Sequence, residues 1–169
     1  LGNTANLILP TDYKGENYVI DSAVFKDNTV ITSVTIPNSV TSIGSDAFEN
    51  CTGLKEVHIN DLAAWCGIDF VTENANPLCS AKNLYLNGEL VTELVIPEGV
   101  KEIKNYAFWN CTGLTSVEIP NSVTFIGERA FCGCSGLTSI EIPNSVTSIG
   151  SSAFSGCSGL TSVKIPNSV

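Results

Sequence analysis

The chain repeats a 23-residue unit, and this period constrains its fold more than any single residue does. Residues 119–141 read IPNSVTFIGERAFCGCSGLTSIE, and residues 142–164 read IPNSVTSIGSSAFSGCSGLTSVK. Residues 96–118 and 36–58 carry the same unit. Self-similarity at a fixed period of this size is typical of solenoids, in which each repeat adds one turn to an elongated core. We therefore expect a repeat solenoid.

The positions that stay constant are almost all apolar, and they indicate two strands joined by a short turn. In the copy at 119–141 they are Ile119, Val123, Ile126, Ala130, Phe131, Cys134, Leu137 and Ile140. The segment LTSIE at 137–141 alternates as a strand with one buried face does, and a proline soon after it ends that strand. The segment SVTFIG at 122–127 predicts a second strand, and AFCGC at 130–134 suits a single helical or 3₁₀ turn.

Stacking of identical rungs is what makes such a short unit stable. At the strand spacing of ~4.8 Å, parallel ladders place Phe over Phe and Cys over Cys in one continuous core. A single copy cannot cover its own two flat faces, so each rung depends on its neighbours.

The pattern L-x-x-[VI]-x-[IL]-P-x-x-[VL]-x-x-I-G-x-x-A-F-x-x-C covers most of the chain and resembles the BspA-like leucine-rich repeats of bacterial secreted and cell-surface proteins. The resemblance implies a right-handed, curved leucine-rich-repeat solenoid, rich in β structure, with parallel ladders and short 3₁₀ or helical turns. It also implies a role in adhesion or protein–protein interaction. Lys104 departs from the pattern where other copies carry Gly44, Gly127 and Gly150, which argues against a strict need for a left-handed backbone there.

We expect one solenoid domain over residues 1–169. It divides into an N-terminal cap with a degenerate repeat (1–35), a regular repeat (36–58), an irregular repeat with an insert (59–95) and regular repeats with a truncated C-terminal end (96–169). Leu1 is not a start methionine and the last unit stops just after Pro166, so we expect the native protein to continue. The alternative is end-to-end self-association through the uncapped C-terminal rung.

The irregular segment between Ile59 and Ile96 is longer than one repeat. Residues 61–66 indicate a short helix with Asp61 as its N-cap, residues 71–77 a loop, and residues 83–90 a hairpin that turns at Asn-Gly. Two interpretations stay open for this segment. It is either an irregular repeat that adds a side lobe or a binding protrusion.

Charge and hydropathy exclude two classes of partner. The formal net charge of −9 and the pI near 4.4, without a cluster of Lys or Arg, argue against nucleic acid and anionic lipid. No apolar run approaches the ~18–20 residues that span a membrane, so we expect no membrane insertion.

The seven cysteines predict neither a metal site nor a cofactor site. Cys51, Cys111, Cys134 and Cys157 fall in the repeat's core column. There, parallel Cβ vectors ~4.8 Å apart do not suit a disulfide, which wants ~3.8 Å. Cys66, Cys79 and Cys132 lie outside that column. A Cys66–Cys79 bridge is an open alternative, but we favour free thiols throughout.

Catalysis is not expected from this sequence. His58 is the only histidine, and it occupies an outward strand position near Glu56 and Asp61. A Cys–His nucleophile would require Cys66 to reach His58 from the insert, and nothing in the spacing enforces that. We therefore predict a protein that is not an enzyme.

Two outward surfaces carry the candidate binding residues. On the strand side, Glu56, His58, Glu118 and Glu141 stand among serine and threonine columns and could hydrogen-bond an extended partner. On the opposite side, aromatic residues and an arginine replace the small and acidic residues of the first regular copy, as at binding hot spots. These residues are Tyr106, Trp109, Phe125 and Arg129. The alternative is that the insert or a neighbouring segment covers them.

We expect a non-enzymatic recognition or adhesion module, secreted or at the cell surface, that binds a protein of a host or neighbouring cell. Tyr106 and Trp109 would supply most of the affinity. An alternative is an accessory polysaccharide-binding or scaffold module of a larger secreted multidomain protein. Glycan sites usually use a planar row of aromatic residues, and the chain offers one short cluster.

Replacing Phe131 by alanine tests the placement of the repeat core. We expect Phe131→Ala to lower the free energy of unfolding by ~3–5 kcal/mol, because a stacked aromatic ring is lost from a packed column. A thermal melt identical to that of the parent protein would contradict this placement.

Overall fold

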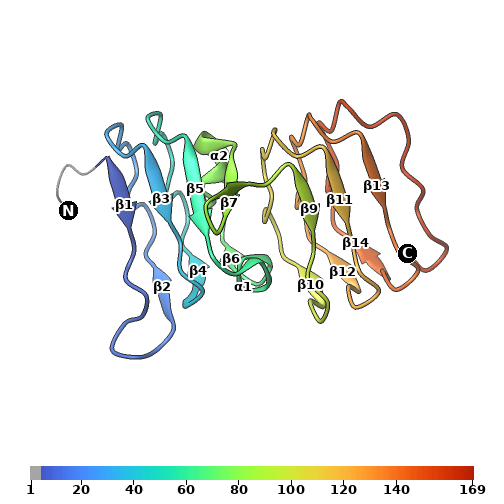
Figure 1. The fold of residues 1–169 in the computed structure, drawn as a ribbon, viewed down its shortest axis with the longest axis horizontal. Coiled ribbons are helices and arrows are strands. Elements are labelled where there is room, and N and C mark those ends of the chain that lie inside the picture. Colours follow the sequence, from blue (N-terminus) through green and yellow to red (C-terminus); the bar gives the residue numbers. More distant parts are fainter. Residues whose placement is uncertain (1–4) are drawn as a thin grey trace.

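The computed structural model describes residues 5–169 as a solenoid (Figure 1). Each turn of the chain is here called a rung, and the strands of successive rungs lie in two rows. The first row holds the strands of the LTSIE type. Its members are β1 (Asn6–Ile8), β3 (Ser33–Thr35), β5 (Glu56–Ile59), β7 (Leu84–Leu86), β8 (Glu89–Leu90), β9 (Glu93–Val95), β11 (Ser116–Glu118) and β13 (Ser139–Glu141). Within the regular repeats, neighbouring strands of this row are parallel and shifted by one 23-residue period, as in the Val117–Ile140 pair.

The second row holds the SVTFIG-type strands. Its members are β2 (Tyr18–Ile20), β4 (Val40–Ile43), β6 (Asp69–Phe70), β10 (Glu102–Ile103), β12 (Phe125–Ile126) and β14 (Ser148–Ile149). All its ladders are parallel. The predicted fold class, a β-rich repeat solenoid with parallel ladders, is therefore confirmed. The degenerate copy also forms a rung, because β2 pairs with β4.

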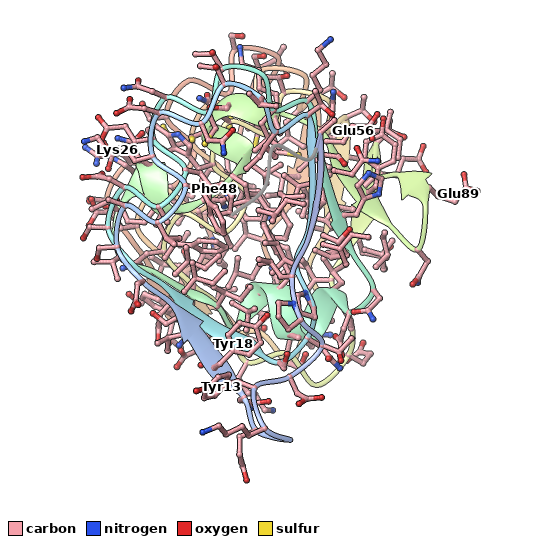
Figure 2. The ribbon with its side chains drawn as sticks, turned by 90° about the vertical axis from the view of Figure 1, so that its left-hand side faces the viewer. Tyr13, Tyr18, Lys26, Phe48, Glu56 and Glu89 are labelled. Carbon is pink, nitrogen blue, oxygen red and sulfur yellow. The ribbon has the colours of Figure 1, made fainter. Side chains whose placement is uncertain are left out.

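The core between the two rows is a column of stacked rings. The ring centroids of Phe108 and Phe131 lie 5.2 Å apart at 10°, and those of Phe131 and Phe154 lie 5.6 Å apart at 5°. Phe25 and Phe48 also lie one over the other nearer the N-terminus, with ring centroids 5.1 Å apart but planes tilted by 30°. Phe48 lies in the interior when the solenoid is viewed along its axis (Figure 2). The predicted placement of Phe over Phe is confirmed.

The core cysteines add hydrogen bonds to this column. The thiol of Cys134 donates to the Phe108 carbonyl of the preceding rung at 3.2 Å, and that of Cys157 donates to Phe131 at 3.1 Å. Cys51 makes the same bond to Phe25. All seven cysteines are free, Cys66 and Cys79 among them. A buried thiol that reaches a carbonyl of the next rung is satisfied without a disulfide.

The AFxxC segments form successive turns in which an amide bonds to the carbonyl three residues earlier, as in a 3₁₀ helix. A residue with positive φ in each turn keeps the turns from continuing into a helix. At the first such position stand Asp46 (φ 58°), Tyr106 (61°), Arg129 (50°) and Ser152 (56°).

The irregular segment differs from its expected layout. Val57 pairs in parallel with Leu84 rather than with Ser80, where the repeat period would place its partner, so residues 60–83 form a complete rung of their own. The hairpin that follows projects from the solenoid (Figure 2). The helical elements of this rung are α1 (Leu62–Cys66), η1 (Glu73–Ala75) and α2 (Leu78–Ala81). The predicted helix is confirmed, with the Asp61 carboxylate accepting from the Ala64 amide at 2.9 Å.

The remaining residues of the irregular segment form the predicted hairpin. Strands β7 and β8 pair antiparallel through Tyr85–Leu90 and Leu86–Glu89. Asn87 (φ 52°) and Gly88 (φ 89°) both have positive φ, as a tight hairpin turn requires.

One cysteine assignment was wrong. Cys79 does belong to the core column, because its Sγ lies 3.8 Å from the Phe48 carbonyl, the counterpart of the contacts that Cys51, Cys134 and Cys157 make. The longer irregular rung displaces Cys79 from the regular spacing, so the period alone could not place it.

Both strand rows are interrupted at the same place, here called the seam, between the irregular rung with its hairpin (60–91) and the rung that begins at β9. The sheets β1-β3-β5-β7-β8 and β2-β4-β6 lie on one side of it, and β9-β11-β13 and β10-β12-β14 on the other.

Side chains of the irregular rung connect the two halves across the seam. The indole of Trp65 donates to the Ala107 carbonyl at 2.9 Å, and the amide of Asn76 donates to Ala107 at 3.1 Å and to Tyr106 at 2.8 Å. Trp65 and Asn76 are both buried. At the equivalent place between regular rungs, a backbone amide makes this bond, as Phe108 does to Ala130. Two side chains therefore replace a backbone donor at this place.

A backbone bond also crosses the seam beside the second row. The Lys104 amide donates to the Cys66 carbonyl at 3.0 Å, and the Lys104 ammonium group lies 2.6 Å from the Asp69 carboxylate. The seam is therefore a break in the two ladders, but the halves remain in contact across it.

The seam also explains why glycine is not needed everywhere in the repeat. A Cβ on Gly127 would lie 2.5 Å from the Asn105 amide of the rung before, whereas Lys104 occupies the same repeat position with the irregular rung before it. Gly127 is not among the residues with positive φ. The glycine is therefore required for close approach of rungs rather than for backbone conformation, as Lys104 had suggested.

A pair of glycine substitutions at one repeat position tests this explanation. A Cβ on Gly136 would lie 2.5 Å from the Thr112 carbonyl, whereas one on Gly113, beside the seam, would lie 3.5 Å from its nearest contact. We expect Gly136→Ala to lower the free energy of unfolding by ~1–3 kcal/mol. Gly113→Ala should change it by less than ~1 kcal/mol. Chemical denaturation measures both, and equal effects would show that rung contact is not the cause.

Candidate binding surfaces

Three residues predicted to bind a partner form one group, here called the turn cluster: Tyr106, Trp109 and Arg129. The Tyr106 and Trp109 rings meet edge to face, with centroids 6.1 Å apart and planes at 72°. The Arg129 guanidinium carbon lies 6.0 Å from the Trp109 ring centroid. Tyr106 and Arg129 stand at the positive-φ position of successive turns, so the turn geometry of the repeat sets where they lie.

The turn cluster is half-buried rather than fully exposed. Tyr106 packs against the core, and Arg129 lies 4.0 Å from Glu73 of η1 and 3.7 Å from Glu128. The expected exposure of these aromatic residues is thus only partly correct. The irregular rung contributes the Glu73 contact to Arg129.

Phe125 lies apart from the turn cluster. It stands on β12 between Glu102 and Ser148 of the neighbouring strands. With Phe70 and Lys104 it lines a separate hollow of about 220 Å³. A strand residue and a turn residue face different sides of the solenoid. Sequence analysis was therefore too broad when it placed Phe125 on one surface with the turn cluster.

On the strand row, Glu56 and His58 form a contact group with a residue that sequence analysis missed. His58 Nε2 lies 3.0 Å from the Glu56 carboxylate, and its ring stacks on Tyr85 with centroids 4.8 Å apart. Tyr85 sits beside His58 in the ladder. The repeat period would place Ala81 there instead, so a search at that period does not find Tyr85. The Asn-Gly turn that follows Tyr85 was the sequence signal that could have placed it on a strand.

Glu118 and Glu141 lie side by side on β11 and β13. They line an open hollow of about 560 Å³, and Lys164 lines the adjoining hollow next to Glu141. Among residues 5–169, neither carboxylate lies within ion-pair distance of a cationic side chain. Like charges directly opposite each other weaken a sheet, so this pair does not serve stability.

A nucleophilic pair of Cys66 and His58, which sequence analysis did not favour, gains no support from the structure. Cys66 is fully buried at the end of α1. Burial, assisted by the nearby Asp61 carboxylate, raises the pKa of the Cys66 thiol to about 12. His58 is engaged with Glu56 and Tyr85 on the outer face. In the described part of the chain, no group of three or more His, Cys, Asp or Glu side chains could hold a metal ion.

Within residues 5–169, none of the helices has the length and apolar character needed to cross a membrane.

Comparison with known proteins places the chain in a family of leucine-rich repeats. The profile of the BspA type leucine rich repeat region matches residues 18–74 and 80–169 in six copies. The structure is similar to a leucine rich cell surface protein of Faecalibacterium prausnitzii, with 34% identity and a TM-score of 0.58. It is also similar to a leucine-rich repeat protein of Bacteroides ovatus, with 26% identity and a TM-score of 0.52.

These similarities extend over nearly all of this chain but only part of the other proteins. The alignments cover 96% and 97% of this chain, and 48% and 46% of the F. prausnitzii and B. ovatus chains. The chain therefore spans about half the length of these structures. No curated protein matches it.

Alkylation of the native protein tests the assignment of Cys66 as an inert thiol. A pKa of about 12 leaves roughly a thousandfold less thiolate at pH 8 than an ordinary cysteine has. We expect iodoacetamide to modify the half-buried Cys132 first and Cys66 only after unfolding, as peptide mass spectrometry can follow. Early labelling of Cys66 would contradict its burial.

Proposed function

Because this chain belongs to the family of BspA type leucine rich repeats, we propose that it is a non-enzymatic recognition module that binds a protein partner at the cell surface or outside the cell. The similar F. prausnitzii structure is of a leucine rich cell surface protein, which supports this location. A solenoid of stacked rungs offers a long, rigid surface, and such surfaces suit protein recognition.

The turn cluster is the observation that favours protein recognition most. Trp, Tyr and Arg are the residue types most enriched at interface hot spots. Here Tyr106 and Arg129 each lie against Trp109, and positive-φ turns of two successive rungs fix the backbones of Tyr106 and Arg129. Such preorganisation lowers the entropy lost on binding. We propose that Tyr106 and Trp109 supply most of the affinity, with Arg129 orienting the Trp109 ring.

The geometry of the turn cluster favours a protein over a glycan. The two aromatic planes stand at 72° to each other, so they do not form the flat platform on which a sugar chain stacks. Arg129 also lies over the Trp109 ring. The strand-row residues Glu56 and His58 are proposed to add hydrogen bonds to an extended partner, as are Glu118 and Glu141.

Phe125 has a lesser place in this proposal. Its separate hollow would contact a partner only if the partner extended from the turn cluster towards β12. We propose it as a peripheral contact.

A binding panel with the purified chain tests the proposal. The panel contains extracellular matrix proteins, secreted proteins, and cell-wall and plant glycans. We expect a saturable protein hit that the Tyr106→Ala/Trp109→Ala double variant weakens by about 2 kcal/mol or more, since hot-spot truncation costs at least this much. Val30→Ala/Val71→Ala is the matched control, because these exposed residues lie outside the cluster.

Two results would contradict parts of the proposal. Protein binding that survives in the Tyr106→Ala/Trp109→Ala variant would remove the site assignment. Hits confined to glycans would favour an accessory polysaccharide-binding module of a larger protein.

A further inference from the structure

In the first strand row, the seam leaves two strand edges unpaired within the described residues. Strand β8 ends the sheet β1-β3-β5-β7-β8, and β9 ends the sheet β9-β11-β13. An unpaired edge presents a row of free amide and carbonyl groups, which natural proteins usually cover.

The ladder register shows which groups of β9 are free. The Ile96 amide donates to the Glu118 carbonyl at 3.0 Å, on the side of β11. Amide and carbonyl groups of alternate residues in a strand point to opposite sides. Those of Glu93 and Val95 therefore point away from β11, towards the seam.

An apolar hollow, here called the edge groove, lies beside these free groups. It has a volume of about 260 Å³ and separates β9 from the β7–β8 hairpin. Its apolar lining comes from Leu62, Leu86, Leu90, Val91, Leu94 and Val95. Leu90 and Val95 are 44% and 58% exposed. Contiguous exposed apolar side chains rimmed by polar residues mark interaction sites.

The β7–β8 hairpin forms one wall of the edge groove. Figure 2 shows the hairpin projecting from the body of the solenoid, with Glu89 at its outer end. Glu89 and Glu93 both line the groove, and neither lies within ion-pair distance of a cation in residues 5–169. The groove is thus apolar inside and acidic at its rim.

We propose that the edge groove binds an extended, basic segment of a partner protein, which adds to β9 as a new strand. The partner's backbone pairs with the free groups of Glu93 and Val95, and its alternate apolar side chains enter the hollow beside Leu90. Its lysine or arginine side chains meet Glu89 and Glu93. Main-chain pairing with pockets for alternate side chains is an established mode of peptide recognition. The inference rests on the proposed protein-binding function and names the chemistry of the partner.

Charge argues against a second copy of this chain as the occupant. Each copy carries a formal net charge of −9 and the same two carboxylates at the groove. Like-charged rims repel, whereas a basic segment is attracted from a distance.

The test uses a fluorescein-labelled heptapeptide that alternates lysine and valine, titrated with the full chain and followed by fluorescence anisotropy. We expect saturable binding that weakens as salt rises. A second peptide with N-methyl groups on alternate amides keeps every side chain but cannot pair with a strand edge. It should bind about tenfold more weakly, the loss expected when ~1.4 kcal/mol of hydrogen bonding disappears. Equal affinity of the two peptides would overturn strand addition, and so would an absence of binding.

Three protein variants locate the binding site of this peptide. Val95→Pro removes a free amide without touching the ladder to β11, since proline is tolerated at that kind of edge. Leu90→Ser removes the apolar wall of the groove, and Val30→Ser is the control at an equally exposed valine. We expect Val95→Pro and Leu90→Ser to weaken the heptapeptide about tenfold and Val30→Ser to leave it unchanged. Circular dichroism confirms that each variant is folded.

Failure of this inference can be told from failure of the proposed function. A protein hit from the binding panel that persists unchanged in Val95→Pro and Leu90→Ser would overturn the edge groove and leave the recognition module intact. Sedimentation of the free chain as a dimer that Val95→Pro dissociates would identify a second copy as the occupant instead.

Discussion

Every part of this molecule depends on the contact between one rung and the next. A single rung leaves both its flat faces uncovered, so its Phe, Cys and strand positions gain burial and hydrogen bonds only from neighbours. The Phe108–Phe131–Phe154 stack and the thiol bonds from Cys134 and Cys157 show this directly. Because the same contact recurs between regular rungs, the same residues suit each of them, and the repeated sequence follows.

Sequence analysis predicted the fold where this contact is regular. The repeat period indicated both strand rows, the Phe column and most of the Cys column, and local rules predicted the Asp61 cap and the Asn87–Gly88 hairpin. The path of the irregular rung was not predicted, because this rung is longer than the regular repeat. It is longer because its helices advance less per residue than strands do. Cys79 and Tyr85 were misplaced or missed for that one reason.

The candidate surfaces were predictable only in part. Columns of the repeat correctly brought Tyr106, Trp109 and Arg129 together, because all three belong to adjacent turns. Sequence analysis left open whether the insert or a neighbouring segment covers them, because the Glu73 contact comes from a rung whose path the period does not describe. The edge groove was equally invisible. It arises where two sheets do not join, and the sequence pattern does not predict which neighbouring strands stay unpaired.

The seam changes which groups hold the two halves of the solenoid together. Between regular rungs, most hydrogen bonds join backbone groups, and almost any sequence supplies an amide and a carbonyl. Across the seam, the Trp65 indole and the Asn76 amide take over part of that role by donating to the carbonyl of Ala107. These two bonds depend on the identity of two side chains, so a point substitution can strengthen or weaken the contact between the halves. The stacking of rungs within each half would stay unchanged.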